Sequence, residues 1–243
     1  MSYSVRVFPN REALAQSFAA MLIKDLDRIE PDHYYTVALS GGSTPEFIFR
    51  YISDNYADRI SWEKILVFWG DERCVGPDDS ESNYRMAYES LLQNVPIPDA
   101  NVLRIMGEED PEAEARQYAE LVSSMVPFFN GIPQFDLMLL GLGDDGHTAS
   151  VFPDRPDLFA TARLFDVALH PATGRKRITA TGRLINNSSK IYYIVTGKGK
   201  ASIVSKIVEK KSGCEIYPAS WVNPGSGQLL WMLDSEAASL LKS

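Results

Sequence analysis

The chain has 243 residues, and its 32 acidic and 24 basic side chains give it a formal net charge of −8 at pH 7. Nucleic-acid binding needs a basic surface, so this balance excludes a general nucleic-acid partner. No apolar run approaches the roughly 18 residues of a membrane span, and the N-terminus has no signal-peptide pattern, so we expect a cytoplasmic protein without a membrane partner.

The absence of a linker indicates how many domains the chain has, and the spacing of the cysteines indicates whether it holds a metal. No linker-like stretch separates two halves, so we expect a single α/β domain over residues 1–243. Cys74 and Cys214 lack metal-ligand spacing, so we expect no metal and no cofactor. His33 and His170 have no partner in the sequence, and we assign them no role.

Segments of helical and extended pattern alternate along the chain. In chain order, the predicted elements are a helix over 12–29, a strand over 34–40, a helix over 45–56, a strand over 65–70, a helix over 82–92, a short strand over 101–105, a helix over 111–126, strands over 135–143, 163–169, 177–181 and 190–196, a helix over 197–210, a strand over 227–234 and a helix over 235–243. No strand is predicted in the first 33 residues. The alternation predicts a doubly wound α/β fold of the Rossmann-like type, with a mostly parallel sheet and helices on both faces.

Four polar clusters follow predicted strands, which is where ligands bind in such folds. They are SGGSTP (40–45), GDER (70–73), GDDGH (143–147) and TGKGK (196–200). We expect these clusters to meet at one edge of the sheet and to form one site.

The first cluster has the composition of a phosphate-binding turn. Gly41 and Gly42 let the backbone approach an anion. Ser43, Thr44 and the start of the following helix supply hydrogen-bond donors. The cluster matches neither the Walker A loop nor the dinucleotide-binding loop. A tight turn that binds nothing is the alternative that this cluster alone leaves open.

The second and fourth clusters supply candidate cations. Arg73 offers a guanidinium fork for phosphate, and Asp71 or Glu72 would orient it or bond sugar hydroxyls. Lys198 and Lys200 lie between a strand and a helix, and one of their ammonium groups is a second candidate phosphate ligand. Arg177 is a third candidate. Taken singly, each of these charges is more often a solvated surface group.

The third cluster carries the candidate catalytic residues. Histidine changes charge near neutral pH, so His147 can act as a general base and then as a general acid. Asp145, two residues earlier, can hold the imidazole in one tautomer, and the glycines at 141, 143 and 146 let the chain turn sharply. A surface or helix-capping histidine is the alternative. The cluster contains no G-x-S-x-G elbow, which argues against a serine hydrolase.

Together and in this order, the clusters resemble those of the 6-phosphogluconolactonase family. The resemblance rests on ALSGGSTPEFIF, FWGDERCVGPDDSESNY, FDLMLLGLGDDGHTASVFP and IYYIVTGKGKA, which lie within residues 38–201. The segment HPATGRKRIT departs from the family's proline-rich lead-in to Arg177.

The resemblance implies hydrolysis of 6-phospho-D-glucono-1,5-lactone to 6-phosphogluconate. It implies that His147 is the base, that Asp145 orients it, and that backbone N–H groups of the glycine turns stabilise the oxyanion. The implied substrate and phosphate ligands are Gly41, Gly42, Ser43, Thr44, Asp71, Arg73, Arg177 and Lys200.

Two other functions remain as alternatives. Glucosamine-6-phosphate deaminase belongs to the same superfamily, but it resembles D-E-Y where this chain has D-E-R, and a catalytic glutamate follows its D-G-H. Here the segment after His147 has no acidic residue before Asp154. A sugar-phosphate sensor would need a DNA-binding segment, and the residues before the first predicted strand offer one helix and no basic patch.

Overall fold

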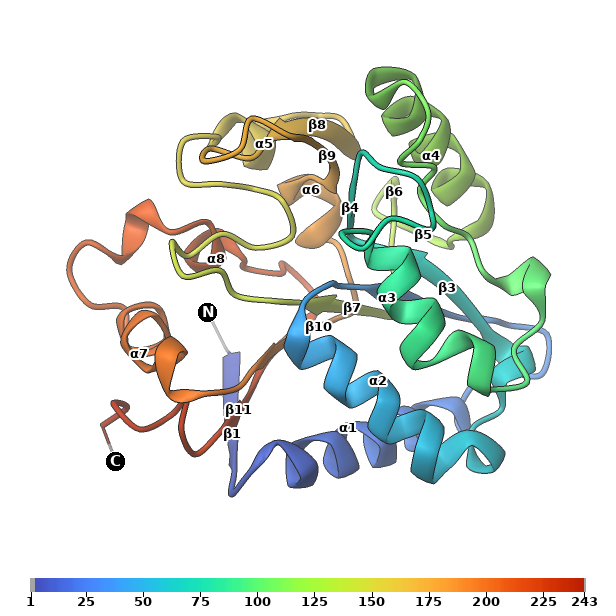
Figure 1. Ribbon diagram of the computed structural model, residues 1–243, viewed down its shortest axis with the longest axis horizontal. Coiled ribbons are helices and arrows are strands. Elements are labelled where there is room, and N and C mark those ends of the chain that lie inside the picture. Colours follow the sequence, from blue (N-terminus) through green and yellow to red (C-terminus); the bar gives the residue numbers. More distant parts are fainter. Residues whose placement is uncertain (1–2, 243) are drawn as a thin grey trace.

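The computed structural model describes residues 3–242, and its centre is a six-stranded parallel sheet (Figure 1). The strand order is β1-β11-β10-β7-β2-β3, and all neighbouring strands run parallel. The strands span β1 Tyr3–Phe8, β2 Tyr35–Leu39, β3 Ile65–Trp69, β7 Leu137–Leu140, β10 Lys190–Val195 and β11 Gln228–Asp234. The predicted α/β class with a mostly parallel sheet is confirmed.

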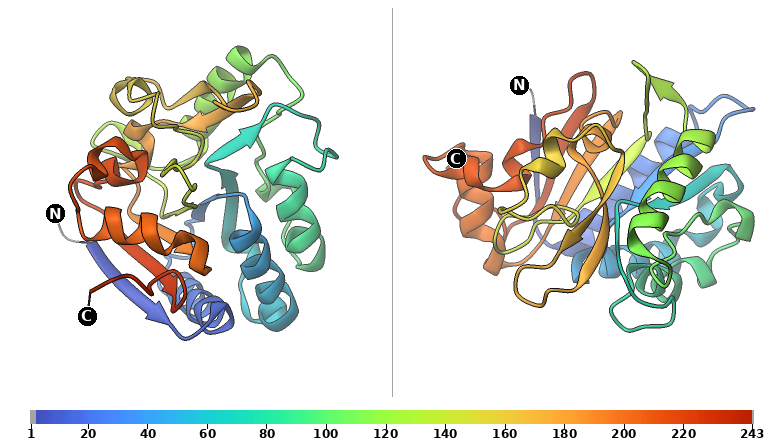
Figure 2. Two further views of the ribbon diagram at one scale, coloured as in Figure 1. Left: turned by 60° about the vertical axis from the view of Figure 1, so that its left-hand side comes forward. Right: turned by 90° about the horizontal axis from the view of Figure 1, so that it is seen from above.

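Helices cover both faces of this sheet. They are α1 Arg11–Leu26, α2 Ser43–Tyr56, α3 Asn83–Ser90, α4 Pro111–Met125, α5 Asp157–Ala160, α6 Gly182–Ile185, α7 Ala201–Val208 and α8 Pro218–Trp221. Helices α1 and α2 pack against each other on one face, and α7 lies on the other (Figure 2). Because strands β2, β3 and β7 are covered on both sides, every residue in them is buried, as their apolar sequences require.

A second, antiparallel sheet continues directly from β3. It has the order β4-β9-β8, and a separate hairpin pairs β5 with β6. These strands span β4 Asp71–Arg73, β5 Phe128–Phe129, β6 Ile132–Pro133, β8 Phe165–Leu169 and β9 Lys176–Ala180. Gly70 links the two sheets, because its N–H donates to Leu39 and its carbonyl accepts from Ala180, at 2.8 and 2.7 Å.

The strands predicted over 163–169 and 177–181 therefore exist, but they do not belong to the parallel sheet. The short turn over residues 170–175 joins them, and a connection of that length can only join antiparallel neighbours. This hairpin lies against α4.

Short elements such as β4, the β5–β6 hairpin, α5, α6 and α8 were not predicted, and three longer segments also differ from the prediction. Strand β1 was missed because it is an edge strand with exposed Ser4 and Arg6, which breaks the apolar signal. The strand predicted over 101–105 makes a single isolated bridge, between Val67 and Val102. Its Leu103 carbonyl accepts the hydroxyl of a tyrosine in α4 instead of a ladder N–H group.

The C-terminal helix predicted over 235–243 is also wrong within the described residues. The N–H groups of Ser239 and Leu241 donate to carbonyls three residues earlier, which is the spacing of successive turns. The last predicted residue, 243, lies outside the part of the chain that the structure describes.

No helix within residues 3–242 is long and apolar enough to cross a membrane. One continuous cluster of buried apolar side chains runs from α1 to the end of β11 and includes Phe165 and Ile178 of the antiparallel sheet. That a single domain spans residues 1–243 stays a prediction.

Tyr118 of α4 ties the helix to the edge of the parallel sheet, and its removal should be measurable. Its buried hydroxyl accepts the N–H of Trp69 at 2.9 Å and donates to the carbonyl of Leu103 at 2.8 Å. We expect Tyr118→Phe to lower the free energy of unfolding by about 1–3 kcal/mol, because a buried N–H group loses its acceptor. Urea unfolding measures this, with the exposed Tyr34→Phe as control. Equal stabilities of the two variants would contradict the role assigned to Tyr118.

Candidate active site

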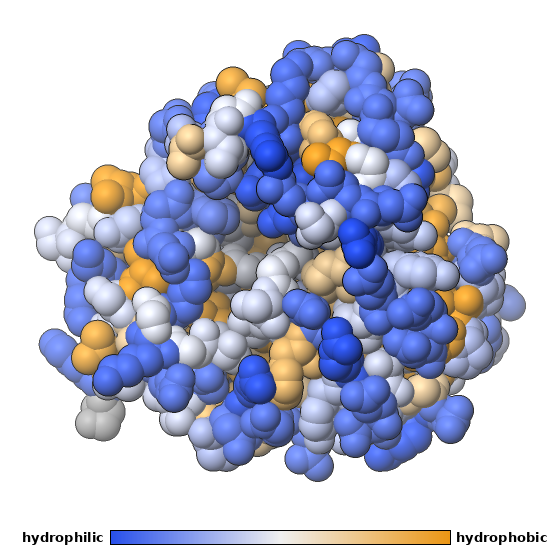
Figure 3. All heavy atoms as spheres, in the orientation of Figure 1, coloured by the Kyte–Doolittle hydropathy of each residue, from blue (hydrophilic) through white to orange (hydrophobic). Residues whose placement is uncertain are grey.

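Three of the predicted clusters meet at the carboxyl edge of the parallel sheet. Thr44 Oγ1 lies 2.8 Å from Thr196 Oγ1, which joins the turn after β2 to the turn after β10. Lys200 Nζ lies 2.5 Å from Asp144 Oδ1, which joins the turn after β10 to the turn after β7. The face of the molecule in Figure 3 is hollowed near its centre and has a largely hydrophilic rim.

His147 and Asp145 form a hydrogen-bonded pair on the turn after β7. His147 Nδ1 lies 2.6 Å from Asp145 Oδ1, and the same oxygen accepts the backbone N–H of His147 at 3.0 Å. An ionised carboxylate only accepts, so Nδ1 carries the hydrogen and the neutral ring keeps its lone pair on Nε2. Nε2 is therefore the atom that can take a proton from a reactant.

Two glycines give this turn its shape. A Cβ atom on Gly143 would lie 2.1 Å from Nδ1 of His147, so the imidazole lies directly against bare backbone. Gly146 has a φ of +80°, and a Cβ atom there would come within 2.5 Å of the Tyr217 ring. Glycine alone meets both conditions without strain.

Two backbone N–H groups of the glycine turns donate hydrogen bonds within this turn. The N–H of Gly143 donates to the His147 carbonyl at 2.9 Å, and the N–H of Gly146 donates to the Gly143 carbonyl at 3.1 Å. The N–H groups of these two glycines close the turn itself, so an oxyanion donor must come from another N–H group of the glycine turns.

The environment of Asp145 keeps it ionised. Burial alone would raise the pKa of Asp145, but hydrogen bonds from the ring and the backbone N–H of His147 outweigh it and lower that pKa to about 2. Asp145 therefore carries its charge throughout the range in which a histidine titrates. It can fix the tautomer of His147 and stabilise the imidazolium form.

The predicted phosphate loop occupies the turn between β2 and α2. Gly41 and Gly42 connect the two elements, and Ser43 is the first residue of α2. Gly42 and Ser43 are exposed at the edge of the sheet, where the N-terminus of a helix attracts anions. Lys200 lies in the short turn before α7, so its ammonium reaches the same edge.

The two acidic residues of GDER are buried and hold local structure. Asp71 Oδ2 accepts the hydroxyl of Ser150 at 2.6 Å. Glu72 accepts the N–H groups of Asn83 and Tyr84, both at 2.7 Å, at the start of α3. Burial raises the pKa of Glu72, although these N–H groups act against the shift. Glu72 therefore fixes α3 against β4.

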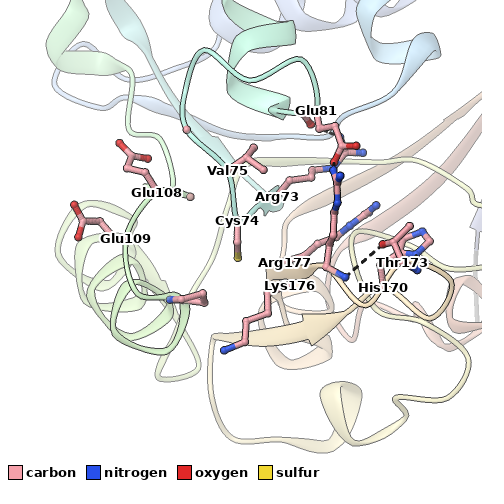
Figure 4. Close-up of a pocket in the computed structure, with 14 residues that line it drawn as sticks. Arg73, Cys74, Val75, Glu81, Glu108, Glu109, His170, Thr173, Lys176 and Arg177 are labelled. Atoms are coloured by element: carbon pink, nitrogen blue, oxygen red, sulfur yellow. Dashed lines mark hydrogen bonds and ion pairs between the residues drawn. The ribbon is translucent and has the colours of Figure 1, made fainter.

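Arg73 and Arg177 are cross-strand neighbours on two adjacent strands of the antiparallel sheet. They are paired directly in the register of β4 and β9. Both line a cavity of about 950 Å³. In Figure 4 the two arginines and His170 lie together on one side of the cavity, and Glu108 and Glu109 lie across it. The predicted cations are thus gathered in two places: Lys200 at the sheet edge, and the two arginines in this cavity.

His170 is a candidate site residue that the sequence did not reveal. It lines the same cavity, and its ring centroid lies 5.3 Å from that of Phe152. The Phe152 ring lies 4.9 Å from the ring of His147. The signal was available only through the pairing of β8 with β9, which places residue 170 in the turn that leads to Arg177.

Within residues 3–242, no three His, Cys, Asp or Glu side chains are grouped so that they could hold a metal ion. The two cysteines are unpaired. Burial raises the pKa of the Cys74 thiol to about 11, so this cavity residue is a poor nucleophile.

Comparison with known proteins identifies the family. Residues 9–231 match the family of glucosamine-6-phosphate isomerases/6-phosphogluconolactonase, and the chain belongs to this family. The 6-phosphogluconolactonase of Treponema pallidum is 39% identical over 232 residues, which cover 86% of this chain and 96% of that protein.

Solved structures show the same architecture. The devB protein is 39% identical and has a TM-score of 0.91, with 98% of this chain and 99% of that chain covered. A monomeric glucosamine-6-phosphate deaminase is 26% identical, with a TM-score of 0.82 and coverage of 98% and 99%. The fold alone therefore does not distinguish the two activities of the family. The distinction must come from the side chains of the site.

The hydrogen bonds from His147 should control the ionisation of Asp145. We expect the Asp145 carboxyl to titrate near pH 2 in the wild-type protein and at higher pH in His147→Ala, where burial remains and the ring hydrogen bond is lost. Carbon-13 NMR of the carboxyl group between pH 1 and 6 measures both midpoints. Identical midpoints would show that His147 does not stabilise the Asp145 charge.

Proposed function

We propose that the chain hydrolyses 6-phospho-D-glucono-1,5-lactone to 6-phospho-D-gluconate, the lactonase step of the oxidative pentose phosphate pathway, with His147 as the general base. The observation that carries this proposal is the 2.6 Å contact between His147 and Asp145, on a turn that Asp144 joins to Lys200. We place the reaction in the cytoplasm, with a small sugar-phosphate lactone as the substrate.

The chemistry uses Nε2 of His147 twice. The neutral ring accepts a proton from water as the water oxygen bonds to C1 of the lactone, and the carbonyl becomes a tetrahedral oxyanion. The oxyanion then re-forms the carbonyl, the bond between C1 and the ring oxygen breaks, and Nε2 returns its proton to that oxygen. The product carries a C5 hydroxyl and a C1 carboxylic acid, which loses its proton to solvent to give the carboxylate. Asp145 stabilises the imidazolium between the two steps.

Binding of the remote phosphate positions C1 against the water. The proposed phosphate ligands are Ser43, Thr44, Arg73, Arg177 and Lys200. Gly41 and Gly42 let the backbone approach the anion. Lys200 is paired with Asp144 in the structure, and the Asp144 side chain is 89% exposed. An incoming phosphate can replace so exposed a partner at little cost.

Asp71 stands further from a direct contact. Asp71 is 4% exposed, and its carboxylate accepts from Ser150, whose hydroxyl oxygen lies 3.4 Å from Arg177 Nη1. Asp71 therefore contributes through Ser150 and Arg177 in this proposal, and a direct contact between Asp71 and substrate stays a prediction.

The deaminase is the second candidate, because it shares the fold. Arg73 in place of the deaminase tyrosine, and the lack of an acidic residue between His147 and Asp154, argue against it. Ammonia release from glucosamine 6-phosphate tests this alternative. Ligand binding without turnover of either substrate would instead favour a sensor.

His147 should contribute to catalysis far more than to binding. We expect His147→Ala to lower kcat by about 10²–10⁴-fold, because general acid–base catalysis is lost. Its affinity for 6-phosphogluconate should stay within about twofold of wild type, since the phosphate ligands are intact. The exposed His33→Ala is the matched control. Turnover of His147→Ala near the wild-type rate would refute the assignment of the base.

Arg73 should act mainly in binding. We expect Arg73→Ala to raise KM by about tenfold or more with a smaller change in kcat, since a hydrogen bond to a charged group is removed. Steady-state kinetics with freshly prepared lactone measures this, and the exposed Arg116→Ala serves as control. An unchanged KM would remove Arg73 from the phosphate ligands.

A further inference from the structure

The imidazole of His170 is held by the turn between β8 and β9. Its Nδ1 accepts the backbone N–H groups of Ala172 and Thr173 at 3.2 and 3.3 Å. Because Nδ1 accepts, a neutral ring must carry its hydrogen on Nε2. The turn thus fixes both the direction of the ring and its tautomer, and it leaves one N–H donor unused by the backbone contacts that hold the ring.

The surroundings of His170 are those of the active site. His170 shares the lining of the 950 Å³ cavity with Arg73 and Arg177. Phe152 stands between the two histidines, since its ring contacts both His147 and His170, and the Arg177 guanidinium carbon lies 5.7 Å from the same ring. A ligand in this cavity is therefore close to the catalytic pair.

The charges on the His170 side of the cavity, opposite Glu108 and Glu109, favour an anion. Arg73 and Arg177 are directly opposite in the sheet, and like charges so placed destabilise the fold. Within residues 3–242 neither of them forms an ion pair, and Arg73 Nε is buried without a hydrogen-bond partner. The other basic side chains of the lining are paired, Arg175 with Glu81 and Lys176 with Glu112. The unpaired positive charge is thus confined to the two arginines beside His170.

We propose that His170 is a substrate-binding residue, whose Nε2–H donates to an oxygen of the phosphate group that Arg73 and Arg177 hold. This inference rests on the proposed lactonase function. It adds His170 as a substrate ligand, and His170 begins the segment HPATGRKRIT, which departs from the family pattern. Burial, and then the positive charge of Arg177, lower the pKa of His170. The ring is therefore neutral in the free protein and supplies a donor without adding a third charge to the arginine pair.

Two substitutions separate binding from support of the turn. In His170→Asn, the amide oxygen can accept the same two backbone N–H groups, but no donor reaches as far as Nε2. In His170→Gln, the amide nitrogen restores a donor at about that reach. His33→Asn is the matched control, because His33 is exposed and belongs neither to the cavity lining nor to the turns that form the site.

The experiment is calorimetric titration of each variant with 6-phosphogluconate and with inorganic phosphate, together with lactone kinetics and urea unfolding. We expect His170→Asn to weaken binding of both ligands and to raise KM by about tenfold, with kcat changed less than threefold. His170→Gln should recover part of the affinity, and His33→Asn should match wild type. The unfolding midpoints of His170→Asn and wild type should agree.

Two results would overturn the inference. One is wild-type affinity for both ligands in His170→Asn. The other is an equal loss of affinity in the asparagine and glutamine variants together with a lowered unfolding midpoint, which would assign His170 to the turn alone. Failure of the lactonase function itself looks different, because the wild-type protein would then neither bind 6-phosphogluconate nor turn over the lactone.

Discussion

The parallel pairing of β7 with both β2 and β10 is the constraint on which the site depends. It places the turn after β7 between the turns that follow its two neighbours, so the His147–Asp145 pair lies between the Gly41–Thr44 loop and Lys200. Parallel strands present their carboxyl ends at the same edge, and residues about 50 and 100 positions apart therefore meet without any long loop. The ion pair between Asp144 and Lys200 shows how closely the turns approach.

A local arrangement of charge offsets the acidity of the whole chain. The net charge of −8 repels a phosphorylated substrate at long range, and salt screens that repulsion beyond roughly 10 Å. At short range the antiparallel sheet presents Arg73 and Arg177 from adjacent strands. Glu72, buried beneath them, holds the start of α3 rather than neutralising them. The second sheet thus holds a concentration of positive charge that costs stability in the free protein, and the proposed phosphate would offset that cost.

The fold class and the contact between Asp145 and His147 could be predicted because their signals are local. An unbroken apolar run marks β7, and Asp145 and His147 are two residues apart. The errors arose where distant residues decide the structure. Edge strand β1 has an exposed face, and the segment over 101–105 gives its carbonyl to Tyr118. The role proposed for His170 could be inferred only from the pairing of β8 with β9, because no residue in that turn predicts this pairing.

The most direct test of this account is the turnover of both family substrates by the wild-type protein. Freshly generated 6-phosphogluconolactone, corrected for spontaneous hydrolysis, should be consumed with a kcat/KM in the ordinary enzymatic range of about 10⁴–10⁸ M⁻¹s⁻¹. Glucosamine 6-phosphate should release no ammonia above background under the same conditions. Ammonia release together with a lactone rate equal to the spontaneous one would contradict the assignment of the site to lactone hydrolysis.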